Sequence, residues 1–157
     1  MLKKLQVIFK TLILSAFFIS ISQAEILKPS SDIKPAEVIG IQLAGLQKND
    51  YNFKDSGIEQ TWNFAHPNNK KVTGPLEKFK KMIKSASYQM MINHLSHTIT
   101  KIESGDNWVQ FEVIILDKEK IYHKFNWQVE KYLIDGPLKD CWLTTMVSSP
   151  IPLGSSI

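Results

Sequence analysis

The strongest constraint on the fold is a run of alternating residues in the second half of the chain. In residues 121–130, Ile, His, Phe, Trp and Val occupy every second position, and mostly polar residues stand between them. A period of two is typical of a strand with one buried and one exposed face. Residues 109–115 alternate in the same way, and Asp117, Lys118 and Glu119 between the two runs form a polar turn sequence. The two runs therefore predict a pair of antiparallel strands.

Three further segments, residues 88–92, 95–102 and 140–147, are also predicted as strands. The sequences Ser-Gly-Asp at 104–106 and Asp-Gly-Pro at 135–137 have the composition of turns that connect strands.

The first half of the chain predicts helices instead. In residues 35–47, Ile39, Leu43 and Leu46 recur at the spacing of one helix face. A second helix is expected from Ser56, which forms a capping-box pattern with Glu59, and it should end before the proline at 67. A third helix is expected to start at Thr73-Gly74-Pro75, with the proline in its first turn and Leu76, Phe79, Met82 and Ile83 on its buried side. The asparagines and lysines that follow the proline at 67 are expected to form a turn between the second and third helices.

Together these segments predict an α+β domain in which three N-terminal helices pack on one face of an antiparallel sheet of about five strands. We assign the domain to residues 35–148, a linker to residues 25–34 and a flexible tail to residues 149–157.

Residues 1–24 have the pattern of a secretory signal peptide. Lysines precede an apolar run, and Ser22-Gln23-Ala24 places small residues at the expected cleavage position. The expected location is therefore periplasmic or secreted, with membrane contact only through this segment before cleavage. An uncleaved N-terminal anchor is the alternative.

The charge of the chain argues against a nucleic-acid partner. Three of the 19 basic residues fall in the signal segment, so 16 remain against 15 acidic residues. The sequence also has no arginine, the side chain that most often contacts phosphates and guanine edges with two hydrogen bonds.

The histidines and the single cysteine are the candidate chemical groups. His123 stands at one of the alternating positions that carry the apolar residues of its strand, so its side chain is expected on the inner face of the sheet. It is therefore the candidate catalytic base of a pocket, and a buried structural histidine is the alternative interpretation. His94 and His97 are expected to face opposite sides of a strand, so we expect no metal site there, and we expect no cofactor. His66 is interpreted as the last residue of a helix. Cys141 is interpreted as a buried structural thiol.

Four segments together resemble an uncharacterised family, domain-of-unknown-function family 4864. They are IQLAGLQKND, GIEQTWNFAHPNNKKVTGPLEKFKKMI, the tyrosine at Tyr88 and CWLTTMV. This family is similar to the nuclear transport factor 2-like superfamily, and its members are exported bacterial proteins and plant plastid proteins. The resemblance implies helices packed into the concave side of a curved sheet, with a conical pocket between them.

In such a fold, aromatic residues at core-facing spacing are expected to line the pocket. The residues predicted for its wall are Trp62, Phe79, Phe111, Phe125, Trp127 and Trp142. Tyr88 is a candidate hydrogen-bond donor beside His123.

The leading functional hypothesis is binding of a hydrophobic small molecule or a protein partner without catalysis, since the inward positions of the predicted strands hold no carboxylate. An isomerase-like or hydrolase-like enzyme that uses His123 is one alternative. The other is an envelope-associated interaction protein that forms a homodimer through its sheet.

Overall fold

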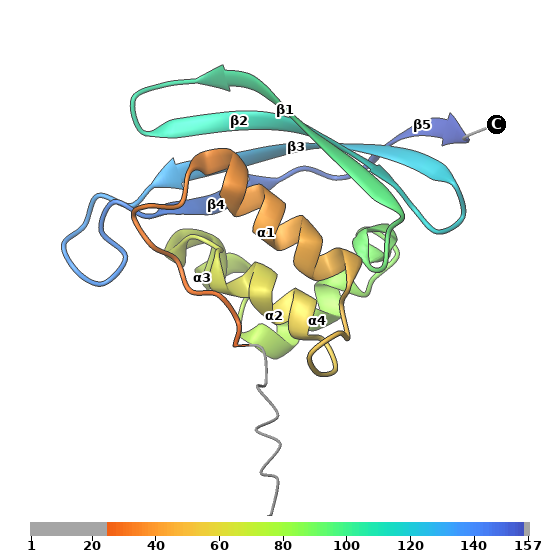
Figure 1. Ribbon diagram of the computed structural model, residues 1–157, viewed down its shortest axis with the longest axis horizontal. Coiled ribbons are helices and arrows are strands. Elements are labelled where there is room, and N and C mark those ends of the chain that lie inside the picture. Colours follow the sequence, from red (N-terminus) through yellow and green to blue (C-terminus); the bar gives the residue numbers. More distant parts are fainter. Residues whose placement is uncertain (1–24, 156–157) are drawn as a thin grey trace, which may run out of the picture.

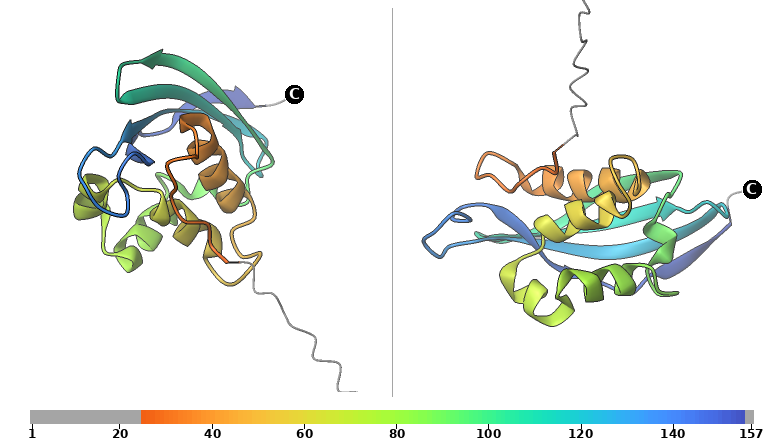
Figure 2. Two further views of the ribbon diagram at one scale, coloured as in Figure 1. Left: turned by 60° about the vertical axis from the view of Figure 1, so that its left-hand side comes forward. Right: turned by 90° about the horizontal axis from the view of Figure 1, so that it is seen from below.

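The computed structural model describes residues 25–155 and shows two layers (Figure 1). One layer is an antiparallel sheet that twists and bends over α1, and the other consists of the helices on one face of that sheet (Figure 2). The α+β class predicted from the sequence is therefore confirmed. The predicted signal peptide lies outside the described residues. Within residues 25–155, no helix combines the length and the apolar composition needed to cross a membrane.

The sheet has the strand order β1-β2-β3-β4, and β5 also pairs with β3. The strands are β1 (Ser96–Ser104), β2 (Trp108–Leu116), β3 (Ile121–Lys131), β4 (Trp142–Val147) and β5 (Ile151–Ser155). In the β2–β3 pair, Phe111 lies opposite Trp127 and Val113 lies opposite Phe125. The period of two thus places the apolar residues of both strands on one face. Those buried there are Val109, Phe111, Val113, Ile115, Phe125, Trp127 and Val129, whereas Ile121 at the start of β3 is exposed.

The helices are α1 (Pro35–Gln47), α2 (Ser56–Asn63), α3 (Pro67–Thr73) and α4 (Leu76–Ile83). Helix α1 crosses the inner face of the sheet, and its residues Val38, Ile39, Leu43 and Leu46 are fully buried (Figure 1). The spacing that predicts this helix from the sequence is therefore the spacing that packs it on the sheet.

Helix α3 is absent from the sequence-based prediction, which treats the asparagines and lysines after Pro67 as a turn. The prediction that His66 is the last residue of the second helix is also wrong, because α2 ends at Asn63 and His66 has an extended backbone. Pro67 begins α3, because proline already has the φ of a first helical turn and needs no hydrogen bond there. The Nδ1 atom of His66 accepts a hydrogen bond from the backbone N–H of Asn68 at 3.1 Å, so His66 is the N-cap of α3.

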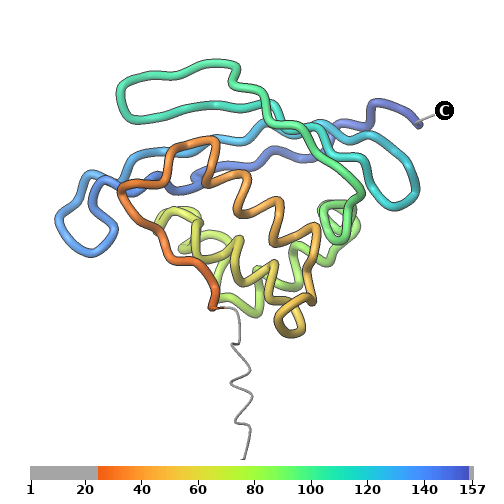
Figure 3. Tube along the Cα trace, viewed as in Figure 1, coloured from red at the N-terminus to blue at the C-terminus, as the bar shows by residue number. Residues whose placement is uncertain are grey.

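The predicted strand over residues 88–92 is wrong, since this segment holds the short 3₁₀ helix η1 (Gln89–Met91). The fifth strand is β5, which lies within the segment that the sequence predicts as a tail (Figure 3). All five residues of β5 are exposed, so the strand has no buried face that a hydrophobic pattern could reveal.

The predicted capping box at Ser56 is also wrong. The N-cap of α2 is Asp55, and the Ser56 hydroxyl donates to the backbone oxygen of Asn49 at 2.8 Å. The Asn49 side chain accepts from the N–H of Ile58 at 3.0 Å and so satisfies one of the free N–H groups in the first turn of α2.

The segment predicted as a linker contacts the helices. The backbone N–H of Leu27 donates to Oε1 of Gln60 at 2.8 Å, and Nε2 of Gln60 donates to the backbone oxygen of Leu27 at 2.9 Å. Ile33 packs against the core.

Candidate ligand-binding site

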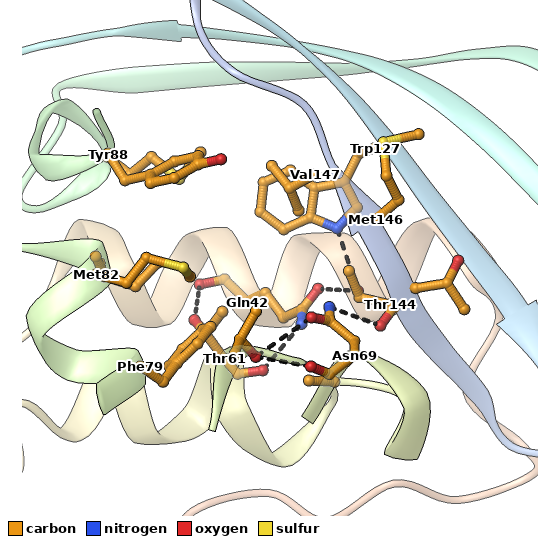
Figure 4. Close-up of a pocket in the computed structure, with 15 residues that line it drawn as sticks. Gln42, Thr61, Asn69, Phe79, Met82, Tyr88, Trp127, Thr144, Met146 and Val147 are labelled. Carbon is orange, nitrogen blue, oxygen red and sulfur yellow. Dashed lines mark hydrogen bonds between the residues drawn. The ribbon is translucent and has the colours of Figure 1, made fainter. Parts of the chain in front are cut away.

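A cavity of about 200 Å³ lies between the helices and the sheet (Figure 4). It is formed by residues from α1, α2, α3, α4, β3 and β4 and from the segments between them. The lining residues are Gln42, Thr61, Ala65, Asn69, Thr73, Phe79, Met82, Ile83, Tyr88, Met91, Trp127, Thr144, Thr145, Met146 and Val147.

One side of the cavity is apolar. Phe79 and Met82 project from α4, and they face Trp127 and Val147 on the sheet (Figure 4). Helix α4 can present this wall because Phe79, Met82 and Ile83 recur three and four residues apart and so lie on one helix face. These aromatic and thioether groups suit a molecule that is mostly hydrocarbon.

The other side carries a chain of buried hydrogen bonds that joins the sheet to two helices. Nε1 of Trp127 donates to Oγ1 of Thr144 at 3.2 Å, and this hydroxyl donates to Oε1 of Gln42 at 2.6 Å. Nε2 of Gln42 then donates to the backbone oxygen of Thr61 at 3.0 Å. We call these four residues the buried polar chain. Because Gln42 and Thr144 are almost completely buried, each of these contacts replaces one that water would otherwise make.

Asn69 and Tyr88 supply polar groups that are only half-buried. Nδ2 of Asn69 donates to the backbone oxygen of Thr144 at 3.3 Å. Within residues 25–155, the hydroxyl of Tyr88 has no hydrogen-bond partner. The two residues lie on opposite sides of the cavity (Figure 4).

Only two of the six aromatic residues predicted for the pocket wall line the cavity. Phe79 and Trp127 line the cavity. Phe111 and Phe125 are buried in the core of the domain. Trp62 lies behind the wall, where its ring packs on Phe79 with centroids 5.1 Å apart.

Trp142, the sixth predicted residue, packs against the edge of the core, and Nζ of Lys131 lies 5.4 Å from its ring centroid. It is not among the residues that line the cavity.

His123 lies at a second cavity, of about 390 Å³, whose walls include Lys84, Gln89 and the turn between β2 and β3. Its Nε2 atom lies 2.7 Å from Oδ2 of the buried Asp117. Its Nδ1 atom is enclosed and has no partner within residues 25–155. Tyr88 lines the first cavity, so the structure does not bring the two candidate catalytic residues together.

Asp117 is held as a carboxylate by its neighbours. Burial by itself raises the pKa of this group. The hydrogen bonds from the N–H of Ile121 and from His123, with the attraction of His123, outweigh burial and leave the pKa below its usual value. Asp117 therefore orients the imidazole of His123 and fixes the turn that follows β2.

His94 and His97 contact each other, which contradicts the expectation that they face opposite ways. His94 precedes β1, and its Nε2 atom lies 2.7 Å from Nδ1 of His97. Since Nδ1 of His94 must donate to the backbone oxygen of Met91 at 2.7 Å, its Nε2 accepts the proton of His97 when both rings are neutral. Burial lowers the pKa of both residues, which favours this neutral arrangement.

Cys141 is buried, as expected, and burial together with the nearby Asp140 raises the pKa of its thiol. A raised pKa keeps the group as the less nucleophilic thiol. Within residues 25–155, no group of three or more His, Cys, Asp or Glu is placed to hold a metal ion.

Sequence reasoning missed the polar residues of the first cavity, namely Gln42, Asn69 and Thr144. It also missed Asp117, the partner of His123 at the second cavity. Gln42 had the most visible signal, because it stands beside Leu43 on the face of α1 that packs on the sheet. Thr144 and Asn69 have no sequence signal of this kind, since threonine in a strand and asparagine near a proline are common on protein surfaces. Asp117 follows β2 directly and is six residues before His123, a spacing that a two-stranded hairpin brings together.

Comparison of the chain with models of protein families, with curated protein sequences and with solved structures gives no match in any of the three.

Proposed function

We propose that this protein binds a small, mostly apolar molecule in the cavity between its helices and its sheet. The observation that carries the proposal is the composition of the cavity wall, which is apolar along α4 and Trp127 and hydrogen-bonding along Gln42, Asn69 and Thr144. Ligand pockets in proteins typically combine an apolar surface with a few polar groups that fix orientation.

Binding without catalysis is better supported than the enzyme alternative. The candidate base, His123, lines a different cavity from Tyr88, and its Nδ1 atom is enclosed. A general base must lie within hydrogen-bond reach of the proton that it removes.

We also propose that the domain is an exported member of domain-of-unknown-function family 4864 with a nuclear transport factor 2-like cone. The four sequence segments that resemble this family support the proposal, as does the position of the cavity between the helices and a bent sheet.

The test is to fill the cavity. Val147 is half-buried at the wall, and Val147→Phe adds most of a ring to the space beside Trp127. Ethylbenzene is a suitable probe because it is neutral and close to the size of one aromatic ring. We expect Val147→Phe to weaken ethylbenzene binding by at least about tenfold, a change that ligand-observed NMR or calorimetry resolves easily.

Val72→Phe is the matched control, because Val72 is 73% exposed on α3 and adds the same volume outside the cavity. This variant should bind ethylbenzene as the unaltered protein does. If the unaltered protein shows no binding of ethylbenzene at the cavity residues, the proposed function is wrong.

A further inference from the structure

We propose that the cavity selects neutral molecules with one amide or hydroxyl group on an apolar body, and that Asn69 binds this group. The inference rests on the proposed function, since it names the class of ligand for the same cavity.

The wall of the cavity contains no side chain that would pair with an ion. Its fifteen residues, all in the described part of the chain, include no Asp, Glu, Lys or His. A carboxylate or an ammonium group that enters such a space loses its hydration and gains no opposite charge in return. A neutral polar group loses much less, and one or two hydrogen bonds offset the loss.

Asn69 is the residue best placed to supply those hydrogen bonds. Gln42, Thr61 and Thr144 are already bonded to one another or to backbone, and each is at most 5% exposed. Asn69 is half-buried and lines the cavity, so a ligand can reach its amide.

The Asn69 amide also keeps unused hydrogen-bonding capacity. Its Nδ2 atom gives one of two protons to the backbone oxygen of Thr144. Its Oδ1 atom lies 3.3 Å from the hydroxyl of Thr73, but that hydroxyl has a shorter contact, 2.9 Å, with the backbone oxygen of Asn69. One donor and one acceptor therefore remain for a ligand, the pattern that complements a primary amide or a hydroxyl group.

The apolar body of the ligand would extend from Asn69 toward Tyr88. These residues lie on opposite sides of the cavity, and Phe79, Met82 and Trp127 stand between them (Figure 4). A polar group at Asn69 thus leaves the rest of the molecule in contact with hydrocarbon and aromatic surface.

Three probes of nearly equal shape test the inference, namely benzamide, benzoate and ethylbenzene. We expect benzamide to bind more tightly than benzoate by at least about tenfold at neutral pH, because only benzoate is charged. In the unaltered protein, benzamide should shift the NMR resonances of the Asn69 side-chain amide, and ethylbenzene should shift those of Trp127 without a comparable effect on the Asn69 amide.

Asn69→Leu removes the amide and keeps the size of the side chain. It should reduce the preference for benzamide over ethylbenzene by about tenfold, the equivalent of one or two hydrogen bonds. Asn68→Leu is the control, since Asn68 is exposed on the same helix and should leave this preference unchanged. Ethylbenzene binding by each variant reports whether the cavity itself is intact.

The outcomes separate this inference from the function on which it rests. If ethylbenzene binds but benzoate binds as tightly as benzamide, the selectivity is wrong and the binding function stands. An Asn69 amide that does not respond to benzamide also overturns the inference, even if Asn69→Leu fails to fold. If none of the three probes binds, both proposals are wrong.

Discussion

Thr144 is the residue on which the buried polar chain depends. One hydroxyl accepts a hydrogen bond from the indole of Trp127 and donates another to Gln42, and Thr144 is only 2% exposed. Valine has nearly the same shape as threonine but can make neither contact. Thr144→Val therefore leaves a buried donor and a buried acceptor without partners.

We expect Thr144→Val to lower the free energy of unfolding by about 2 to 4 kcal/mol in urea titrations, since each orphaned buried group costs about 1 to 3 kcal/mol. Thr145→Val is the control, because the Thr145 hydroxyl is half-buried and makes only a long contact, 3.4 Å, with the backbone oxygen of Gln128. Equal losses in the two variants would show that the buried polar chain adds no stability of its own.

His66 makes the stability of the protein depend on pH. Burial lowers its pKa below the usual value of about 6.5, despite the opposing attraction of Glu130. Its Nδ1 atom must be unprotonated to accept the hydrogen bond that caps α3. The unfolded chain therefore binds more protons than the folded one as the pH falls, and the stabilisation present above pH 6.5 is lost as the pH falls through the folded pKa.

Two substitutions at this position separate the cap from the titration. His66→Ala should cost about 1 kcal/mol at neutral pH because it removes the cap. His66→Asn keeps a capping oxygen but does not titrate, so its stability should fall less steeply below pH 6.5. The pH dependence of the free energy of unfolding that remains in this variant should come in part from His94 and His97, whose pKa values are also lowered. If the free energy of unfolding of His66→Asn falls with pH as steeply as that of the unaltered protein, this account of His66 is wrong.

The contact between α1 and α2 depends on Gly57. An added Cβ atom at this position would lie 2.0 Å from the backbone oxygen of Gly45, and neither backbone can move away without separating the helices. Gly40, on the same helix as Gly45, has open space around its missing side chain. Gly57 is therefore required for the contact between the two helices, whereas Gly40 can be replaced by a larger residue.

Gly57→Ala should lower the free energy of unfolding by about 3 kcal/mol because it forces the two helices apart. Gly40→Ala should raise it by about 0.5 to 1 kcal/mol, since alanine favours a helix interior and meets nothing here. Thermal or urea unfolding of the two variants checks both signs. A Gly57→Ala variant as stable as the unaltered protein would contradict the close contact.

At the scale of the whole molecule, the sequence predicts the parts of the fold whose burial is periodic. Strands β2 and β3 and helix α1 were predicted within a few residues because their buried positions repeat at two or at 3.6 residues. Strand β5 and helix α3 were missed because neither has a buried residue within its bounds. These elements are specified by backbone pairing and by the proline at 67, not by a hydrophobic pattern.

The candidate site was less predictable than the fold. Phe79 and Trp127 are predicted as pocket residues from their core-facing spacing and from the family resemblance, and they do line the cavity. The polar half of the wall was not predictable, because Gln42 meets Thr144 across 102 positions of sequence. No local pattern records a contact between residues so far apart.

The same separation has a consequence for how the protein folds. The hairpins of the sheet can form from neighbouring residues, but the cavity wall needs α1 from the beginning of the domain and β4 from its end. Contacts between residues so far apart in sequence have the largest entropy loss on loop closure, and they tend to slow folding. A nascent chain therefore cannot complete the cavity until β4 has been synthesised. A molecule held in the completed cavity would then tie the first helix to the last inner strand and protect the entire domain against unfolding.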